Sequence, residues 1–433
     1  MKKHIVFLYI KSPSRLSHIR KIATLKEKYT VTIIHAKVSN PDYIQHFCHH
    51  AIGVSSENTI ENFTGILDKL SHIPAPDGIV NLSEPFLPIH SRLCQHFGLL
   101  GPSEMAVSVG RNKYNMRKFA RELDIPIPGF VEVTSKNLCE AQSLDFPVVV
   151  KPVVGSGSTL VKRFESFEEL ERGYSELSHS AEQIFAQDSQ VNEVEIEDYP
   201  FIVEEIIGGE VLFNTQLPVT IGEISVESVY ANGEVTILAI HDKPLPNNGP
   251  YFEEVGYSTP SRIPQDVQDK AEAIVGKIHR ALGEGSFVLH TEFRTFSDGP
   301  VLLEFGIRMG GAAIYNSLLA STGIDFIDVQ VDIVLGLPID IGHAYKIPTI
   351  TQFLFPERQG KILAIKGEPS LVTEPSYVEH QIYDDVGDIA YRAPAAARST
   401  MHVLFQHSDF PYLEQRVINA VNAFDILTEP END

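Results

Sequence analysis

The chain has 433 residues, of which 43% are hydrophobic and 21% are charged, so a packed core is expected and general disorder is excluded. This length corresponds to about three domains. With 57 acidic and 35 basic residues the formal net charge is −22, which argues against general nucleic-acid binding and against docking on an anionic membrane. Three cysteines show no metal-ligand spacing and cannot form a disulfide framework, so we expect reduced thiols in a cytoplasmic protein. They are Cys48, Cys94 and Cys139.

Short apolar runs alternate with amphipathic stretches over the first hundred residues. This alternation predicts a parallel, doubly wound sheet. The first run is too short for a signal sequence and ends at Lys11, and no run is long enough to span a membrane. The expected strands are 4–10, 31–36, 51–54 and 78–82, and the expected helices are 16–28 and 58–70.

The segment NLSEPF follows the strand at 78–82 and contains Glu84. Ligands of parallel sheets gather at the carboxyl ends of the strands, which favours a substrate role for Glu84. Alternatively, Ser83 or Glu84 begins the next helix as a cap or first-turn acid, and the sequence leaves both interpretations open. No GxGxxG follows the first strand, so a dinucleotide site is not expected there.

A helix is predicted over 113–123, and Pro126 and Pro128 end it at a plausible domain boundary. The next segment, 146–164, is typical of a strand, a glycine loop and a second strand, with Lys151 leading into Gly155–Thr159. Such a loop can present N–H groups to phosphate, although a lone Gly/Ser loop is more often a turn. Lys113 taken by itself is an ordinary solvated lysine.

Strand patterns dominate from 211 to 240, where Asn232-Gly233 predicts a hairpin turn. The segment 243–261 is predicted to be a long polar loop, of a length that is often functional. The remaining expected elements, in chain order, are a helix at 167–177, a strand at 201–207, a helix at 265–282, a hairpin at 286–307, helices at 314–321 and 326–335, and strands with one late helix after about 340.

The hairpin VLHTEFRTFSDGPVLLEFGIRMGG is the most informative segment. A turn centred on Asp298 pairs Glu292 with Glu304, and period-2 alternation places both carboxylates on one face. The opposite face is predicted to be the core face. It carries Phe293, Leu303, Phe305 and Ile307.

Like charges at about 5 Å repel by about 3 kcal/mol at an effective dielectric of about 20, so the two carboxylates need compensation. A divalent cation such as Mg²⁺ would provide it, and so would an ion network with Arg294 and Arg308. Gly310 and Gly311 would let a ligand approach the backbone, which favours a site.

The order of four motifs resembles the ATP-grasp superfamily of carboxylate–amine ligases. The motifs are NKYNMRKFARELDIPIPGF, FPVVVKPVVGSGS, FIVEEIIGGE and EFRTFSDGPVLLEFGIRMGG. Together with the segments HDKPL and GPYFEEVGYSTPS, they look most like the L-amino-acid ligase, or dipeptide synthetase, branch. The resemblance implies an α/β fold of ATP-grasp architecture. It comprises an N-terminal doubly wound, Rossmann-like domain (1–111), a small α+β lid domain (112–206) and a larger α+β domain (207–433), with 340–433 as a candidate appended subdomain.

The same resemblance implies residue roles. Arg308 and Lys243 would be catalytic, with Arg308 stabilising the transferring phosphoryl group, and Glu292 and Glu304 would carry Mg²⁺, with Mn²⁺ as a substitute. The ATP-binding residues would be Lys113, Lys151, Gly155, Ser156, Gly157, Ser158, Glu204, Glu205, Ile207 and Glu210. The substrate-binding residues would be Glu84, Tyr257, Arg308, Gly310 and Gly311.

Three positions depart from the family pattern. Gly306 stands where relatives carry an Asn metal ligand, which puts the two-metal geometry in doubt. Val211 stands where relatives carry a ribose-contacting acid, and Glu210 is one position away. Tyr257 replaces a His of the relatives, which bears on substrate choice.

The implied activity is an ATP-dependent ligase that joins an L-amino acid to the amine of a second amino acid through an acyl-phosphate, releasing ADP and phosphate. The alternatives are an ATP-grasp ligase or carboxylase with a non-amino-acid substrate, and an inactive nucleotide-binding regulatory protein. The expected partners are small molecules (ATP and amino acids), without nucleic acid or membrane, and a homodimer is an assembly that the resemblance allows.

Overall fold

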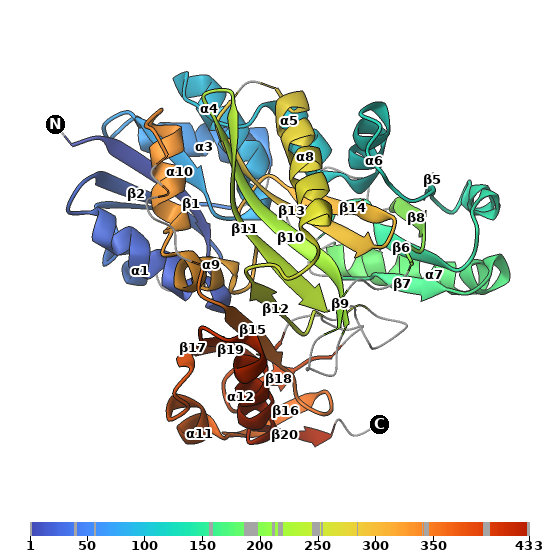
Figure 1. Ribbon diagram of the computed structural model, residues 1–433. Coiled ribbons are helices and arrows are strands. Elements are labelled where there is room, and N and C mark those ends of the chain that lie inside the picture. Colours follow the sequence, from blue (N-terminus) through green and yellow to red (C-terminus); the bar gives the residue numbers. More distant parts are fainter. Residues whose placement is uncertain are drawn as a thin grey trace.

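Figure 1 shows the computed structural model, in which an N-terminal sheet, a lid sheet and a C-terminal segment surround one large central sheet. The structure describes residues 2–38, 41–55, 58–155, 159–185, 198–209, 213–214, 220–244, 252, 254–283, 285–339, 341, 346–392 and 399–430.

The N-terminal unit is the expected parallel sheet, with strand order β3-β2-β1-β4. Its strands carry apolar side chains to both faces, because helices cover both sides. The strands are β1 (His4–Ile10), β2 (Thr30–Ala36), β3 (His50–Gly53) and β4 (Gly78–Asn81). The helices are α1 (Leu16–Leu25), α2 (Pro41–Gln45), α3 (Ile60–Leu70), α4 (Leu87–Phe97) and α5 (Glu104–Arg111), with 3-10 turns at Pro13–Arg15 and Glu84–Phe86.

The lid is an antiparallel sheet with strand order β5-β8-β6-β7. One face packs against its long helix, where an apolar cluster forms. Its strands are β5 (Phe130–Val133), β6 (Val148–Pro152), β7 (Lys162–Phe164) and β8 (Phe201–Glu205). Its helices are α6 (Lys113–Glu122), α7 (Phe167–Phe185) and a 3-10 turn at Leu138–Ser143, and α7 runs further than the expected helix.

The large sheet has strand order β14-β13-β10-β11-β12-β15-β19-β17, with β9 paired to β10. The strands are β9 (Phe213–Asn214), β10 (Thr220–Ala231), β11 (Glu234–Pro244), β12 (Gly256–Thr259), β13 (Phe287–Phe296), β14 (Gly299–Gly306), β15 (Thr349–Leu354), β17 (Tyr377–Ile382) and β19 (Met401–Gln406). The helices α8 (Gln265–Ala281), α9 (Ile314–Thr322) and α10 (Phe326–Val334) pack on it.

The predicted hairpin turn at Asn232-Gly233 is confirmed. Both residues have positive φ, 54° and 81°, as a two-residue turn of this kind requires. The polar segment 243–261 is not a loop throughout. It begins with the end of β11, and β12 lies within it and pairs with β11 and β15, so the prediction was wrong for 243–244 and 256–259. Residues 245–251 and 253 of this segment lie outside the described residues.

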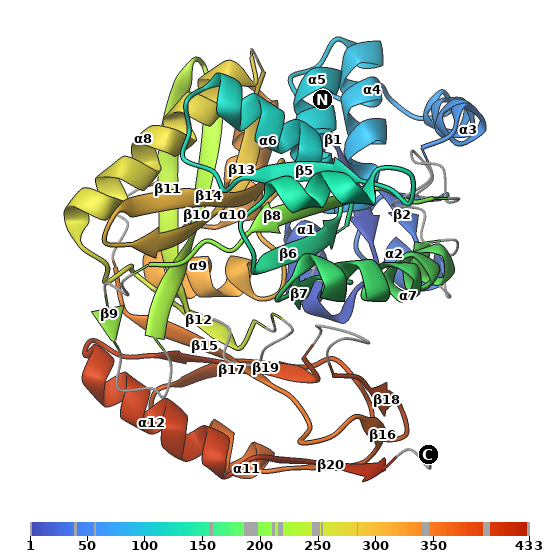
Figure 2. The same cartoon turned by 90° about the vertical axis from the view of Figure 1, so that its right-hand side faces the viewer.

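The C-terminal segment divides between two sheets. Strands β15, β17 and β19 extend the large sheet, whereas β16 (Gly360–Lys366), β18 (Ile389–Ala390) and β20 (Asp425–Pro430) form a small sheet of their own. Helices α11 (Glu368–Val372) and α12 (Phe410–Asn422) complete the segment. Figure 2 shows both helices and the small sheet below β15, β17 and β19. The domain limits 1–111, 112–206 and 207–433 fall between elements, and we keep them as a proposal.

Candidate functional site

The two glutamates of the predicted hairpin lie directly opposite each other. Glu292 on β13 pairs with Glu304 on β14, as the alternation predicted. A β-bulge at this point leaves Leu303 without a partner residue on β13. As a result Leu302, not Leu303, is the fully buried core residue, so the predicted core face was wrong at Leu303.

Lysines compensate the opposed carboxylates. Lys243 Nζ pairs with Glu292 and lies 3.0 Å from Glu254 Oε1, and Lys113 Nζ lies 3.2 Å from Glu304 Oε2. Burial works to raise the pKa of Glu292, yet Lys243 and His290 hold that pKa well below its usual range. The Glu292 carboxylate therefore stays ionised.

The alternative network with two arginines is wrong. Arg294 Nε lies 3.1 Å from Glu223 Oε2 on β10, and Arg308 Nε donates to Glu84 Oε2 at 2.7 Å. Neither guanidinium neutralises the opposed pair, because both are committed to other carboxylates.

The predicted phosphate-binding groups converge beside this hairpin. The backbone N–H of Lys113 donates to Val153 O at 2.8 Å, and its Nζ donates to Gly155 O at 2.9 Å. Lys151 Nζ donates to Glu204 Oε2 at 2.7 Å. The start of α6 is therefore fastened to the beginning of the glycine loop, of which Ser156, Gly157 and Ser158 lie outside the described residues.

Two of the predicted ATP-binding residues, Glu204 and Glu205, end β8, and Ile207 follows it. Glu204 is buried beside Lys151, and the Glu205 carboxylate accepts hydrogen bonds at 3.1 Å from the backbone N–H groups of Gly129 and Asp145. Both carboxylates are therefore committed to protein partners. Glu210 and Val211 lie outside the described residues.

Glu84 reaches the site from the N-terminal sheet. Ser83 makes no capping hydrogen bond; instead, its Oγ accepts from the Ile10 backbone N–H at 2.9 Å. Glu84 is in the first turn of a 3-10 helix, but its carboxylate points away to Arg308 and lies 3.9 Å from Arg111 Nε. The helix-cap interpretation is therefore wrong for Ser83, and Glu84 forms an ion pair across two sheets.

Gly310 and Gly311 differ in their surroundings. A Cβ at Gly310 would lie 2.8 Å from His290 Nδ1 and 2.9 Å from Glu227 Oε1, whereas a Cβ at Gly311 would meet nothing within 4 Å. The Gly310 backbone N–H donates to Glu227 Oε2 at 3.1 Å. Tyr257 on β12 is buried in an apolar cluster nearby, together with Ala313, Ile314 and Phe353.

Sequence analysis missed a buried acid–histidine pair behind the hairpin. His290 Nδ1 contacts Glu227 Oε1, and His290 Nε2 lies 3.2 Å from Glu292 Oε1. Burial would lower the pKa of His290, but Glu227 raises it to about 9. The acids at 223 and 227, on one face of a strand-forming segment, were the signal that could have found this pair.

A pocket connects several of these groups. It measures about 480 Å³ including its opening to solvent. Its lining includes Glu84, Arg111, Lys113, Gly155, His290, Glu304, Gly306 and Arg308. Lys113, Glu304 and the Glu84–Arg308 pair thus face one space.

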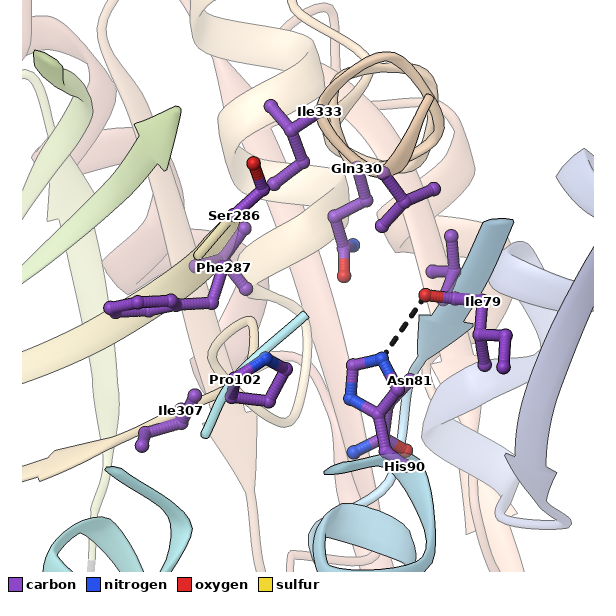
Figure 3. Close-up of a pocket in the computed structure, with 12 residues that line it drawn as sticks. Ile79, Asn81, His90, Pro102, Ser286, Phe287, Ile307, Gln330 and Ile333 are labelled. Carbon is purple, nitrogen blue, oxygen red and sulfur yellow. Dashed lines mark hydrogen bonds between the residues drawn. The ribbon is translucent and has the colours of Figure 1, made fainter. Parts of the chain in front are cut away.

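A separate pocket of about 300 Å³ lies between β4, the start of β13 and α10 (Figure 3). Apolar side chains such as Ile79, Phe287 and Ile333 dominate its lining, and His90 Nε2 donates to Ile79 O at 3.1 Å. Since none of the predicted site residues lines it, we do not assign it to the chemistry.

The donor set fits Mg²⁺ only with further ligands. Glu292 and Glu304 offer carboxylate oxygens, and Mg²⁺ commonly takes one or two carboxylates with substrate phosphates. Among the described residues there is no group of three or more His, Cys, Asp or Glu that could hold a metal alone. Gly306 adds no ligand; a Cβ there would lie 3.7 Å from Glu84 Oε2.

Comparison with known families identifies the central part of the chain. Residues 144–316 match the model of the ATP-grasp domain, a range that holds the glycine loop, β8 and the carboxylate hairpin. Residues 144–316 therefore carry the ATP-grasp domain.

Relatives and solved structures agree with this assignment. An alanine–anticapsin ligase from Bacillus subtilis is 26% identical over 322 residues, covering 72% of the chain and 66% of that protein, just under two thirds of its length. The L-amino acid ligase from Bacillus licheniformis superposes with a TM-score of 0.81 at 20% identity, over 99% of both chains. The N5-carboxyaminoimidazole ribonucleotide synthetase from Thermotoga maritima has a TM-score of 0.67 at 16% identity, over 99% of this chain and 100% of that one.

These similarities confirm the expected α/β ATP-grasp architecture and support the L-amino-acid ligase branch of the superfamily. ATP-dependent ligases are the class of enzyme to which the named relatives belong, as the sequence resemblance implied. No helix in the described part of the chain is long and apolar enough to cross a membrane.

Proposed function

We propose that this protein is an ATP-dependent ligase that joins an L-amino acid to the amine of a second amino acid and releases ADP and phosphate. The observation that carries the proposal is the shared pocket, where Lys113 and Glu304 face the same space as the Glu84–Arg308 ion pair. Lys113 and Glu304 suit a phosphate group and a metal ion, and the Glu84–Arg308 pair suits the ammonium and carboxylate of a zwitterion.

The chemistry explains why such a set is needed. A carboxylate is a poor electrophile, and transfer of the ATP γ-phosphoryl group converts it to an acyl-phosphate with phosphate as leaving group. Attack by an amine then forms the amide. The protein mainly has to position the reactants and neutralise charge on the phosphoryl group.

Side chains of this protein can neutralise the negative charge of ATP and of the transferring phosphoryl group. Lys113 and Lys151 would hold ATP phosphates, the loop that begins at Gly155 would cover them, and Arg308 would stabilise the transferring phosphoryl group. Mg²⁺ at Glu292 and Glu304, with Mn²⁺ as a substitute, would supply further charge neutralisation when bound. Lys243, which pairs with Glu292, would add one more positive charge near the phosphates.

The amino-acid substrate is supported by the charges of Glu84 and Arg308. A carboxylate and a guanidinium held 2.7 Å apart can exchange their mutual pair for the ammonium and carboxylate of a zwitterion. Gly310 and Gly311 follow Arg308 in the sequence, and Tyr257 lies in the apolar cluster that includes Ala313 and Ile314. We propose that these three residues shape the side-chain space. An inactive regulatory protein would not need both glutamates and Arg308.

The test is phosphate release from Mg-ATP, scanned over single amino acids and all pairs, with mass spectrometry of active mixtures. We expect phosphate only with particular pairs, together with a product mass equal to their condensation. The Glu304→Gln variant should lose turnover by roughly 10²-fold or more, as expected for a lost charge-stabilising group.

ATP binding without turnover of any pair would overturn the amino-acid substrate. It would favour a non-amino-acid substrate, such as those of the purine-pathway ligases that share the fold. We further propose a homodimer, which light scattering of the purified chain would test.

A further inference from the structure

Helix α6 lies between the lid sheet and the carboxylate hairpin and presents two cations to them. Lys113 and Arg117 are four residues apart, so they lie on one face of the helix. Lys113 contacts Gly155 O and Glu304 Oε2, as described above. Arg117, one helical turn after Lys113, makes a second connection between the lid sheet and the hairpin.

Arg117 joins the lid to the hairpin. It is 2% exposed and is the bulkiest of the fully buried side chains. Its Nε donates to Glu204 Oε1 on β8 at 2.5 Å, and its Nη2 donates to Leu303 O on β14 at 2.7 Å. The β-bulge at Leu303 is what frees this carbonyl from the strand ladder.

Glu204 stands between two cations. Oε1 takes Arg117 and Oε2 takes Lys151 at 2.7 Å. Burial would raise the pKa of Glu204, but Arg117 and Lys151 together lower it to about 2. A buried carboxylate of this kind needs a cation, and here two groups share the task.

We propose that Arg117 is a positioning residue for ATP. Because Arg117 also pairs with Glu204, Lys151 can leave that carboxylate and bind a phosphate. The hydrogen bond from Arg117 to Leu303 O holds the lid against the hairpin. The inference rests on the proposed function, since it assumes that Lys151 meets an ATP phosphate. Without Arg117, Lys151 would be the only cation beside a buried carboxylate, and binding ATP would then have to leave that carboxylate unpaired.

A purely structural ion network is the competing explanation, and a double-variant comparison separates the two. We would measure binding of Mg-ATP by calorimetry to the whole chain, to Arg117→Met, to Glu204→Gln and to the variant carrying both changes. Arg121→Met, one turn further along the same helix at an exposed position, is the matched control.

We expect Arg117→Met to weaken ATP binding by about tenfold or more, the equivalent of one charge-assisted hydrogen bond. The double variant should recover most of this loss, because Glu204→Gln removes the charge that would hold Lys151. Arg121→Met should bind ATP as the unchanged chain does. A loss that the double variant does not recover, or no loss in Arg117→Met, would overturn the inference.

Arg117→Lys keeps a cation beside Glu204 but lacks the fork that also reaches Leu303. It should keep ATP affinity to within about threefold while lowering turnover, because charge sharing persists and the lid loses its anchor. An affinity loss as large as that of Arg117→Met would contradict charge sharing, and this comparison holds even if Arg117→Met fails to fold. If the unchanged chain binds no ATP, the proposed function itself fails.

Discussion

Lys243 is surrounded by carboxylates. It pairs with Glu292, lies 3.0 Å from Glu254 and lies 3.8 Å from Glu223. Burial would lower the pKa of Lys243, but the three acids raise it well above its usual value, so the ammonium persists. A permanent charge at this position is what a phosphate-contacting role requires.

Replacing Lys243 with Gln should therefore remove the positive charge that compensates Glu292. We expect turnover to fall by roughly 10²-fold, as for other groups that stabilise a transition-state charge. Steady-state phosphate release would measure it. Lys270→Gln is the control, because Lys270 makes only a surface pair with Asp266 at 3.2 Å; equal losses in both variants would contradict the role.

The two glycines after Arg308 provide a matched pair of variants. Gly310→Ala should lower turnover by about tenfold or more. The new Cβ would displace His290 and Glu227, and His290 contacts Glu292. Gly311→Ala should have little effect, since a Cβ there meets nothing within 4 Å. Comparable kinetics of the two variants would show that the Glu227–His290 contact does not matter for turnover.

At the scale of elements, the hairpin shows why sequence reasoning succeeded only in part. Two-residue alternation and a turn at Asp298 were enough to pair Glu292 with Glu304. The strands in fact meet around Ser297 and Asp298, with Phe296 opposite Gly299, and the bulge at Leu303 restores the predicted pairing. A bulge leaves no signal in the alternation, so the wrong core residue was assigned.

Long-range ion pairs were also beyond sequence reasoning. Lys243 meets Glu292 because β11 and β13 flank β10 in the large sheet. Arg308 meets Glu84 because the chain brings the ends of β14 and β4, from different sheets, close together. Spacing along the chain reports neither arrangement. By contrast, continuous apolar runs and the Asn232-Gly233 turn carry local information, and the elements that they predict are present.

Helix α12 is fastened to the large sheet by a partly buried ion pair. Arg262 Nη1 donates to Glu414 Oε1 at 2.6 Å, and the Arg262 backbone N–H donates to Asp242 Oδ2 at 2.8 Å. Glu414→Ala should lower the free energy of unfolding by about 2 kcal/mol, because it removes a charge-assisted hydrogen bond from a partly buried guanidinium. Urea unfolding measures the change. Gln415→Ala, at the next position of the same helix, should be nearly neutral, and a similar loss there would argue that the helix alone is responsible.

At the scale of the whole molecule, buried histidines make the fold sensitive to acid. Burial lowers the pKa of His18 and His279 to about 3 and that of His90 and His241 to about 4. The folded chain keeps these rings neutral, whereas the unfolded chain binds protons below about pH 6.5. Their stabilisation is therefore full above that pH and is lost as the pH falls towards 4.

His90→Gln isolates one of these contributions, since an amide can still donate to Ile79 O in place of the ring. Between pH 7.5 and pH 5, the free energy of unfolding should fall by about 2 kcal/mol less in the variant than in the unchanged chain. Urea unfolding at both pH values measures the difference. Parallel losses in the two proteins would mean that His90 is protonated in the folded state or hydrated in the cavity of Figure 3.

The C-terminal segment was expected as a candidate appended subdomain, yet β15 pairs directly with β12, the strand that carries Tyr257. A chain shortened at residue 339 would lose β15, β17 and β19 and leave β12 with one row of unpaired backbone groups. Exposed strand edges of this kind recruit other chains. The C-terminal segment therefore also protects the large sheet from self-association. We expect its removal to cause aggregation of the protein before any effect on substrate binding could be measured.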